Sequence, residues 1–224
     1  MNQEYENLID VLIKGGYLKT PEIIESFKAI DRKDFVTEEH QKDAYVNAPL
    51  PIGFGQTISQ PLTVAFMMEL LEPKTGEKIL DIGAGSGWAA AILAYIVGKH
   101  RLSADSGESA LLLAVERVPE LKEMAEKNVA KYNFIEKGIA RIVLSDGSKG
   151  YKKEAPYDKI IAAAAAYSDI PKDWRGQLKI GGRIVAPVGN SIVLINKLGK
   201  NKFDKKEFFG FSFVPLIEEK AAQP

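Results

Sequence analysis

An apolar run broken by three closely spaced glycines, KILDIGAGSGWAAAILAYIVG (78–98), limits the possible folds of this chain more than any other feature. The part before the glycines has the composition of a buried strand, and the alanine-rich part after them predicts a helix that ends at Gly98. A strand, a glycine turn and a helix in this order open a β-α-β unit. In such units a nucleotide-like ligand binds at the turn, beyond the carboxyl end of the strand.

Strands and helices continue to alternate along the rest of the chain. Strands are predicted at ALLLAVE (110–116), ARIVLSDG (140–147), YDKIIAAAAA (157–166) and GGRIVAPVG (181–189), with helices at 119–133 and 169–178. The tail predicts an antiparallel pair, SIVLINKLG (191–199) and EFFGFSFVPL (207–216), around a lysine-rich turn at 200–206. This order predicts an α/β fold, a doubly wound, mostly parallel seven-stranded Rossmann-like sheet with helices on both faces.

The segment before the glycine turn is predicted to be a helical cap followed by an irregular loop. Leu8, Leu12 and Ile13 share one helical face, and TPEIIESFKAI (20–30) starts with Thr20 as the expected N-cap. PLTVAFMMELLE predicts another helix before Pro73. Between these helices, GFGQTISQP (53–61) has no helical or strand period, so we expect either a surface connection or a functional loop.

Charge and residue usage argue against several classes of protein. The chain has 30 basic and 30 acidic side chains, so it lacks the overall attraction that a nucleic-acid binder uses, and we expect no nucleic-acid partner. Cysteine is absent, which excludes disulfides, thiolate metal sites and a cysteine nucleophile. No apolar run is long enough to cross a membrane, and the acidic start does not resemble a secretory signal. We therefore expect a cytoplasmic protein.

Three carboxylates follow three successive predicted strands, at Asp81, Glu116 and Asp146. The spacing GAGSG does not complete the dinucleotide fingerprint, and Asp81, expected at the mouth of the site, would repel a pyrophosphate. It would favour a ligand with an ammonium and a sulfonium group, namely S-adenosylmethionine. Glu116 is placed to accept from the ribose hydroxyls and Asp146 from the adenine amino group. Each carboxylate alone could instead cap a strand end.

Several motifs together resemble a known family. DIGAGSG, VER, SDG, APYDKI and QLKIGGRIVAPVG look like a class I methyltransferase, and LPIGFGQTISQP upstream, with VPL near the end, resembles the protein-L-isoaspartate (D-aspartate) O-methyltransferase family. The resemblance covers about 35–216. It implies methyl transfer from S-adenosyl-L-methionine to the α-carboxylate of L-isoaspartyl and D-aspartyl residues in damaged proteins, which begins repair through a succinimide. The product would be S-adenosyl-L-homocysteine, and no metal is implied.

The resemblance also implies a set of site residues. Ser59 corresponds to the residue taken as catalytic, and the segment around it contributes to the substrate and cofactor sites. The substrate contacts expected are Thr57, Ile58 and Ser59; the cofactor contacts expected are Gln56, Thr57, Asp81, Gly83, Ala84, Gly85, Gly87, Glu116, Arg117, Asp146 and Gly147. An α-carboxylate is already ionised near neutral pH, so no general base is needed, and His40 and His100 lie outside the motifs.

The sequence departs from the family pattern at two places, and two alternative functions remain to be considered. Ala163 stands where the family commonly has threonine, and residues 99–110 add roughly a dozen residues, expected at the end of the sheet opposite the cofactor. A class I methyltransferase with another acceptor, or a cofactor-binding module without catalysis, are the alternatives. We expect a monomer with one domain, in which 1–60 form the helical cap and active-site loop, 61–190 the cofactor-binding core and 191–224 the C-terminal strand pair.

Overall fold

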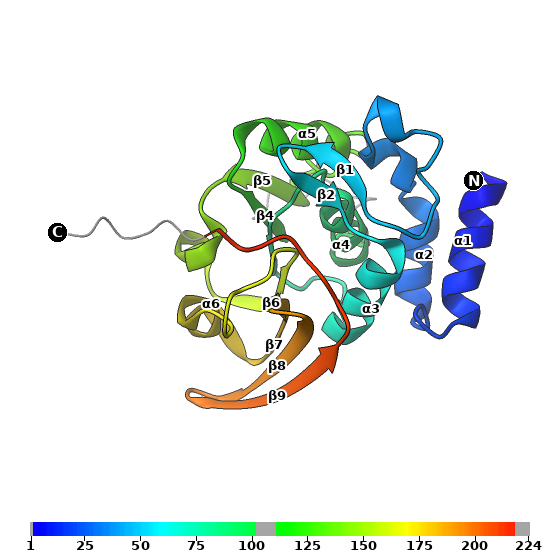
Figure 1. Ribbon diagram of the computed structural model, residues 1–224. Coiled ribbons are helices and arrows are strands. Elements are labelled where there is room, and N and C mark those ends of the chain that lie inside the picture. Colours follow the sequence, from blue (N-terminus) through cyan, green and yellow to red (C-terminus); the bar gives the residue numbers. More distant parts are fainter. Residues whose placement is uncertain (1, 102–110, 218–224) are drawn as a thin grey trace.

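A sheet of seven strands forms the centre of the computed structural model, which describes residues 2–101 and 111–217 (Figure 1). Its strands are β3 Ile79–Ile82, β4 Leu112–Glu116, β5 Ala140–Leu144, β6 Tyr157–Ala162, β7 Leu178–Val188, β8 Ser191–Gly199 and β9 Lys202–Phe209. They lie in the order β5-β4-β3-β6-β7-β8-β9. The first five in this order pair in parallel, and β8 and β9 are antiparallel. The predicted mostly parallel seven-stranded sheet is confirmed.

Helices cover both faces because the central strands are apolar on both sides. The helices are α1 Gln3–Lys14, α2 Pro21–Ala29, α3 Pro61–Leu71, α4 Trp88–Val97, α5 Pro119–Ala130 and α6 Lys172–Gln177, with short 3-10 turns at η1 Arg32–Phe35, η2 Glu38–His40, η3 Gly147–Lys149 and η4 Lys152–Glu154. Successive residues of β3 point to opposite faces of the sheet and belong to two separate hydrophobic cores. Ile79 packs with α3, α4 and α5, whereas Leu80 packs with Trp174 of α6.

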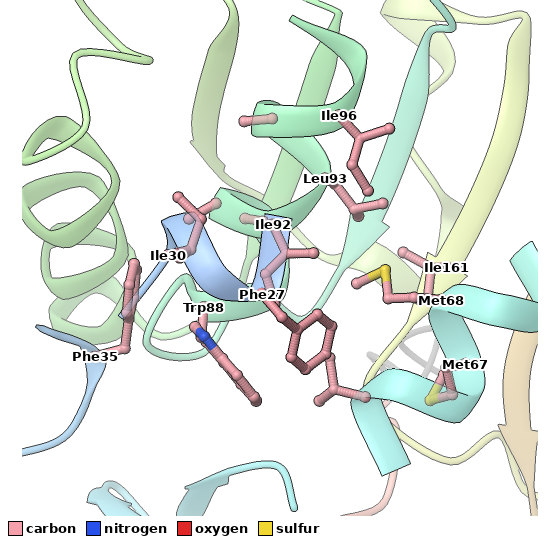
Figure 2. Packing of buried hydrophobic residues seen from close by; sticks show 14 of the residues in the cluster. Phe27, Ile30, Phe35, Met67, Met68, Trp88, Ile92, Leu93, Ile96 and Ile161 are labelled. Carbon is pink, nitrogen blue, oxygen red and sulfur yellow. The ribbon is translucent and has the colours of Figure 1, made fainter. Parts of the chain in front are cut away.

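The larger core lies between the sheet and the first five helices. Figure 2 shows Phe27 of α2, Trp88 of α4 and Met68 of α3 within it. The rings of Phe27 and Trp88 meet edge to face with centroids 5.5 Å apart, a geometry that adds to the hydrophobic gain from burying them. In Figure 1, α2 lies beside α4 and α1 lies outside α2, which confirms the predicted N-terminal helical cap.

Thr20 occupies the predicted N-cap position of α2 without making a capping hydrogen bond. Its hydroxyl instead donates to Glu69 Oε2 over 2.8 Å, and Glu69 Oε1 accepts from the Thr20 backbone N–H. These bonds join the start of α2 to α3. On α1, Leu8 and Leu12 are buried as predicted, because they share the face that packs on α2.

The segment expected to be an irregular loop contains a β-hairpin, and that expectation was wrong. β1 Leu50–Gly53 pairs antiparallel with β2 Gln56–Ile58. Phe54 and Gly55 form its tip with φ angles of +53° and +69°. Strands of four and three residues are too short for an alternating pattern to be recognised in the sequence, and the glycines at the tip are equally typical of a loop.

The predicted C-terminal antiparallel strand pair is confirmed, but its lysine-rich turn is shorter than the predicted 200–206. β8 and β9 turn at Lys200 and Asn201, and β9 runs from Lys202 to Phe209. Most side chains of β9 are exposed because it is the edge strand of the sheet, where lysines prevent pairing with other chains. The predicted strand at 207–216 ends at Phe209, and the extended segment after it makes only an isolated bridge, from Pro215 to Ala165.

Other predicted boundaries shift by a few residues. β5 ends at Leu144 because Asp146 already caps η3, and β6 ends at Ala162, whereas β7 begins at Leu178, three residues earlier than expected. The insertion predicted at 99–110 and the tail from 218 lie largely outside the described residues. The ends of α4 and β4 that flank the insertion lie at the edge of the sheet opposite the glycine turn. No helix within 2–101 and 111–217 has the length and apolarity to cross a bilayer.

Candidate active site

A cavity of about 170 Å³ lies at the carboxyl ends of β3, β4 and β5, where a doubly wound sheet binds its ligands. Its walls come from the hairpin tip, three strand ends and the C-terminal segment. The lining residues are Phe54, Gln56, Thr57, Ile82, Gly83, Gly85, Val115, Glu116, Arg117, Val118, Ser145, Asp146, Gly147, Ala163, Ala164, Val214, Pro215, Leu216 and Ile217. Eight of the predicted cofactor contacts are in this set.

The three glycines of the turn have different surroundings. Gly83 has a φ of +84° and lines the cavity, and a Cβ built on it would have no heavy atom within 4 Å. Gly87 has a φ of +90°, but its Cβ would lie 3.0 Å from Val129 Cγ2 and 3.1 Å from Ala125 Cα of α5. Gly83 therefore leaves space for a ligand, whereas Gly87 lets α4 approach α5. Neither Gly87 nor Ala84 lines the cavity, and their contact with a cofactor stays a prediction.

Asp81 is buried in β3 and does not line the cavity, which corrects its expected position at the mouth. Its side chain is buried in β3, and its Oδ2 atom has no hydrogen-bond partner. Burial, together with the nearby Glu116 carboxylate, raises the pKa of Asp81 to about 7. An unpaired buried carboxylate is unfavourable unless a cation approaches it. The residue thus fits a ligand that brings a positive charge to the turn.

Glu116 lines the cavity with its carboxylate held by backbone N–H groups. Oε2 accepts from Gly85 N at 2.9 Å, and Oε1 accepts from Arg117 N at 2.8 Å and Val118 N at 3.0 Å. These bonds fix the glycine turn to the end of β4. Each carboxylate oxygen has two lone-pair positions, so Glu116 retains acceptor capacity for a ligand hydroxyl.

Asp146 and Gly147 form the cavity wall at the end of β5. The Asp146 carboxylate accepts from the N–H and the hydroxyl of Ser148, both at 2.9 Å, and so caps η3. A Cβ on Gly147 would lie 2.5 Å from Ile82 Cγ2, so only glycine lets this turn pack against β3. The turn is held further by Trp174, whose Nε1 donates to the Gly147 carbonyl at 2.9 Å.

A second hollow, of about 560 Å³, adjoins the first across a shared wall. It is lined by Pro49, Thr57, Ser59, Gln60, Leu62, Thr63, Ala163, Gly210, Phe211, Ser212, Phe213 and Val214. Thr57, Ala163 and Val214 line both spaces, and we call these three residues the partition. Of these two spaces, Ser59 lines only the second hollow. The side chain of Ile58 is buried in the larger core, so only the backbone of Ile58 is available for a substrate contact.

The C-terminal segment forms the wall opposite the hairpin. Figure 1 shows it in red, running from the end of β9 across the front of the sheet. Two hydrogen bonds hold it to the loop after β6: Ala165 N donates to the Val214 carbonyl, and Leu216 N donates to the Ala165 carbonyl, both at 2.8 Å. The predicted motif VPL is thus part of the site, although it forms no regular strand.

The comparisons with known proteins agree with this geometry. The model of the family described as protein-L-isoaspartate(D-aspartate) O-methyltransferase matches residues 2–221. The chain belongs to this family. A protein-L-isoaspartate O-methyltransferase of Staphylothermus marinus is 39% identical over 98% of both chains, and one of Methanopyrus kandleri is 39% identical over 97% of this chain and 93% of its own.

A solved structure supports the fold of this isoaspartate methyltransferase family. A crystal structure assigned to the same class of enzyme in Plasmodium falciparum, in complex with S-adenosyl-L-homocysteine, superimposes with a TM-score of 0.82. The match covers 98% of this chain and 100% of that chain at 21% sequence identity. The arrangement of strands and helices is therefore shared along the whole chain.

Sequence reasoning missed several wall residues of this methyltransferase family member. Val118 and Ser145 line the cavity beside the predicted contacts Arg117 and Asp146, and that adjacency is the only sequence signal for them. Phe54 lines it because it lies at the tip of the hairpin, which the sequence pattern did not predict. Ala164 and Ile217 reach it through the tertiary contact between the loop after β6 and the tail. In residues 2–101 and 111–217, no cluster of three or more histidine, cysteine, aspartate or glutamate side chains is arranged to hold a metal ion.

Proposed function

We propose that this chain transfers the methyl group of S-adenosyl-L-methionine to the α-carboxylate of L-isoaspartyl and D-aspartyl residues in damaged proteins. The products are the methyl ester and S-adenosyl-L-homocysteine, and the ester then closes to the succinimide that begins repair. The observation that carries the proposal is the pair of adjoining spaces, one walled by strand-end carboxylates and one by Ser59, in a chain of this family.

The first cavity suits the cofactor. The unpaired Asp81 oxygen offers a partner for a cationic group, and the open space at Gly83 lets a ligand approach the backbone. We propose that Glu116 accepts from the ribose hydroxyls and Asp146 from the adenine amino group, with Gln56, Thr57, Gly85 and Arg117 completing the site. When bound, S-adenosyl-L-methionine supplies a methyl group on a positively charged sulfur.

The second hollow suits the acceptor. The α-carboxylate is ionised near neutral pH, so this chain need not remove a proton, and none of the described lining residues is a histidine. We propose that the Ser59 and Thr57 hydroxyls hold one carboxylate oxygen while the other faces the partition. Catalysis by this chain is then mainly the positioning of two bound groups.

A labelled-donor assay tests the proposal directly. Purified protein is incubated with methyl-labelled S-adenosyl-L-methionine and a pair of peptides that differ only in an isoaspartyl or an aspartyl residue. We expect base-labile label on the isoaspartyl peptide alone. Equal labelling of both peptides would indicate another acceptor, and binding of S-adenosyl-L-homocysteine without any labelling would indicate a module that has lost catalysis.

We also propose that the protein acts as a monomer in the cytoplasm, with damaged proteins or peptides as its partners and without nucleic acid. The formal net charge of zero supports the last point. Size-exclusion chromatography with light scattering checks the oligomeric state.

Replacing Asp81 with asparagine is expected to have opposite effects on stability and on donor binding. Because the pKa of Asp81 rises from 3.8 to about 7 on folding, the folded state binds the extra proton between these values. Stability of the ligand-free wild type should therefore fall as pH rises from 4 to 7, and Asp81→Asn should be the more stable protein at pH 8. Urea unfolding at pH 5 and pH 8 measures this difference.

Asp81→Asn, although more stable than the wild type at pH 8, should bind the donor more weakly. At pH 8 the charged Asp81 attracts the cationic donor, and we expect Asp81→Asn to bind S-adenosyl-L-methionine at least about tenfold more weakly. At pH 5 the wild type must first lose a proton, so the difference should shrink. Calorimetry at both pH values measures it. Equal affinities at pH 8 would show that Asp81 does not contact the donor.

A further inference from the structure

Arg32 of η1 is completely buried, and its guanidinium binds only backbone carbonyls. Nη1 donates to Ala44 O at 2.6 Å and more weakly to Val46 O at 3.4 Å, and Nη2 donates to Ala48 O at 2.9 Å and Ser59 O at 3.2 Å. One side chain thus joins the loop at 44–48 to the residue expected to hold the acceptor.

Neighbouring bonds extend this connection to the start of α3. Asn47 Oδ1 accepts from Leu62 N at 3.0 Å, and the Asn47 carbonyl accepts from Gln60 Nε2 at 3.0 Å. Gln60 and Leu62 both line the second hollow. Arg32 therefore anchors, from behind, the segment that forms one side of the acceptor space.

The charge of Arg32 is not paired with a carboxylate. In the described part of the chain no aspartate or glutamate oxygen forms an ion pair with it, and the guanidinium lies 5.4 Å from the centre of the Trp88 ring. Burial lowers its pKa to about 10, so it keeps its proton at neutral pH. An unpaired buried cation raises the potential around it more than a surface cation does.

The second hollow has no charged side chain among its described lining residues, although the proposed acceptor is an anion. The amino end of α3, which begins at Pro61, points positive partial charge toward this region. Behind Ser59 the nearest positive group that its contacts reveal is the Arg32 guanidinium. A carboxylate in the hollow would thus be favoured by a charge that it does not touch.

We propose that Arg32 is a positioning residue of the acceptor site. Its guanidinium fixes the Ser59 peptide relative to the loop at 44–48, and its unpaired charge makes the hollow select an anionic acceptor over a neutral one. The inference rests on the proposed function and deepens it, because it assigns the selection for the carboxylate to a residue outside the pocket wall.

Two substitutions separate position from charge. Arg32→Met removes the charge with little loss of length, and Arg32→Lys keeps the charge but loses the forked donor geometry. Arg183 provides matched controls, Arg183→Met and Arg183→Lys, because its Nη1 also donates to a backbone carbonyl, Leu70 O at 2.6 Å, but lies in neither space. For each protein we measure kcat and KM for an isoaspartyl peptide and the Kd for S-adenosyl-L-homocysteine. We also measure the binding ratio between that peptide and its α-carboxamide analogue in the presence of S-adenosyl-L-homocysteine.

We expect Arg32→Met to lower the preference for carboxylate over carboxamide by about tenfold and to lower kcat, with product affinity within about threefold. Arg32→Lys should keep most of the preference and lose at least about tenfold in kcat. The ratio is the decisive readout, since a merely structural role would weaken both peptides equally. An unchanged ratio in Arg32→Met, or a wild-type kcat in Arg32→Lys, overturns the inference.

Failure of folding does not prevent the test. If Arg32→Met does not fold, Arg32→Lys decides through its kcat and its ratio, both measured at a temperature at which circular dichroism shows the variant to be folded. A wild type that labels no isoaspartyl peptide overturns the proposed function and the inference together. An active wild type with unaffected Arg32 variants overturns the inference alone.

Discussion

Replacing Ser59 with alanine is expected to lower turnover of an isoaspartyl peptide by about a hundredfold while donor affinity stays within about tenfold of the wild type. Ser59 lines only the second hollow, so we expect its hydroxyl to contact the acceptor and not the donor. Losing one oriented donor lets the carboxylate move away from the line of attack, which costs rate more than binding. Steady-state kinetics and calorimetry with S-adenosyl-L-homocysteine provide the two measurements.

The structure offers a matched control for this substitution. Ser168 is exposed and lines neither space, so Ser168→Ala should leave kcat, KM and donor affinity unchanged. If Ser59→Ala abolished donor binding, Ser59 would belong to the donor site, contrary to the geometry. If it retained full turnover, the Thr57 hydroxyl or backbone N–H groups would be sufficient to orient the acceptor.

Alanine at Gly83 and alanine at Gly87 are expected to fail in different ways. Both glycines have positive φ angles, so both substitutions carry a similar backbone cost of ~1 to 2 kcal/mol. At Gly83 the new methyl group enters open space at the cavity wall, where it competes with the donor. We expect a weakening of donor binding by roughly tenfold to a hundredfold, with a modest loss of stability.

At Gly87 the methyl group meets the backbone of α5 instead. Ala125 Cα and Ala125 O would both lie 3.1 Å from it, and neither can move without shifting the helix. Overpacking adds ~1 to 3 kcal/mol to the φ cost, so the melting temperature should fall by about 5 to 15 °C. The folded fraction should still bind the donor. Thermal unfolding measures the loss of stability in both variants, and calorimetry measures their affinity for the donor. An equal loss of stability in the two variants would contradict the different roles assigned to Gly83 and Gly87.

The sequence predicts the parallel core well because its strands and helices carry their own patterns. KILDI, LLAVE and YDKII are short segments rich in Ile, Leu and Val, and each is followed by a turn or helix that fixes where the strand ends. The carboxylates at those ends fall at one edge of the sheet for the same reason. The alternation of strands and helices in the sequence is therefore sufficient to predict most of the residues that line the first cavity.

The remaining parts depend on tertiary contacts that the pattern does not contain. The hairpin at 50–58 is too short to show alternation, and the lysines of β9 are typical of a turn until the edge position of the strand is known. Asp81 was expected at the mouth, but its side chain is buried in β3 and does not line the cavity. Arg32 belongs to a charged stretch that predicts a surface, and only the fold shows it buried among carbonyls.

The partition determines when, during synthesis of the chain, the two binding spaces become complete. Thr57, Ala163 and Val214 come from the second, third and last quarters of the chain, and all three line both spaces. A nascent chain that stops at the end of β9 contains every strand of the sheet, yet it lacks one wall of both sites. Methyl transfer must therefore wait until residues 214–217, which complete the cavity wall, have left the ribosome.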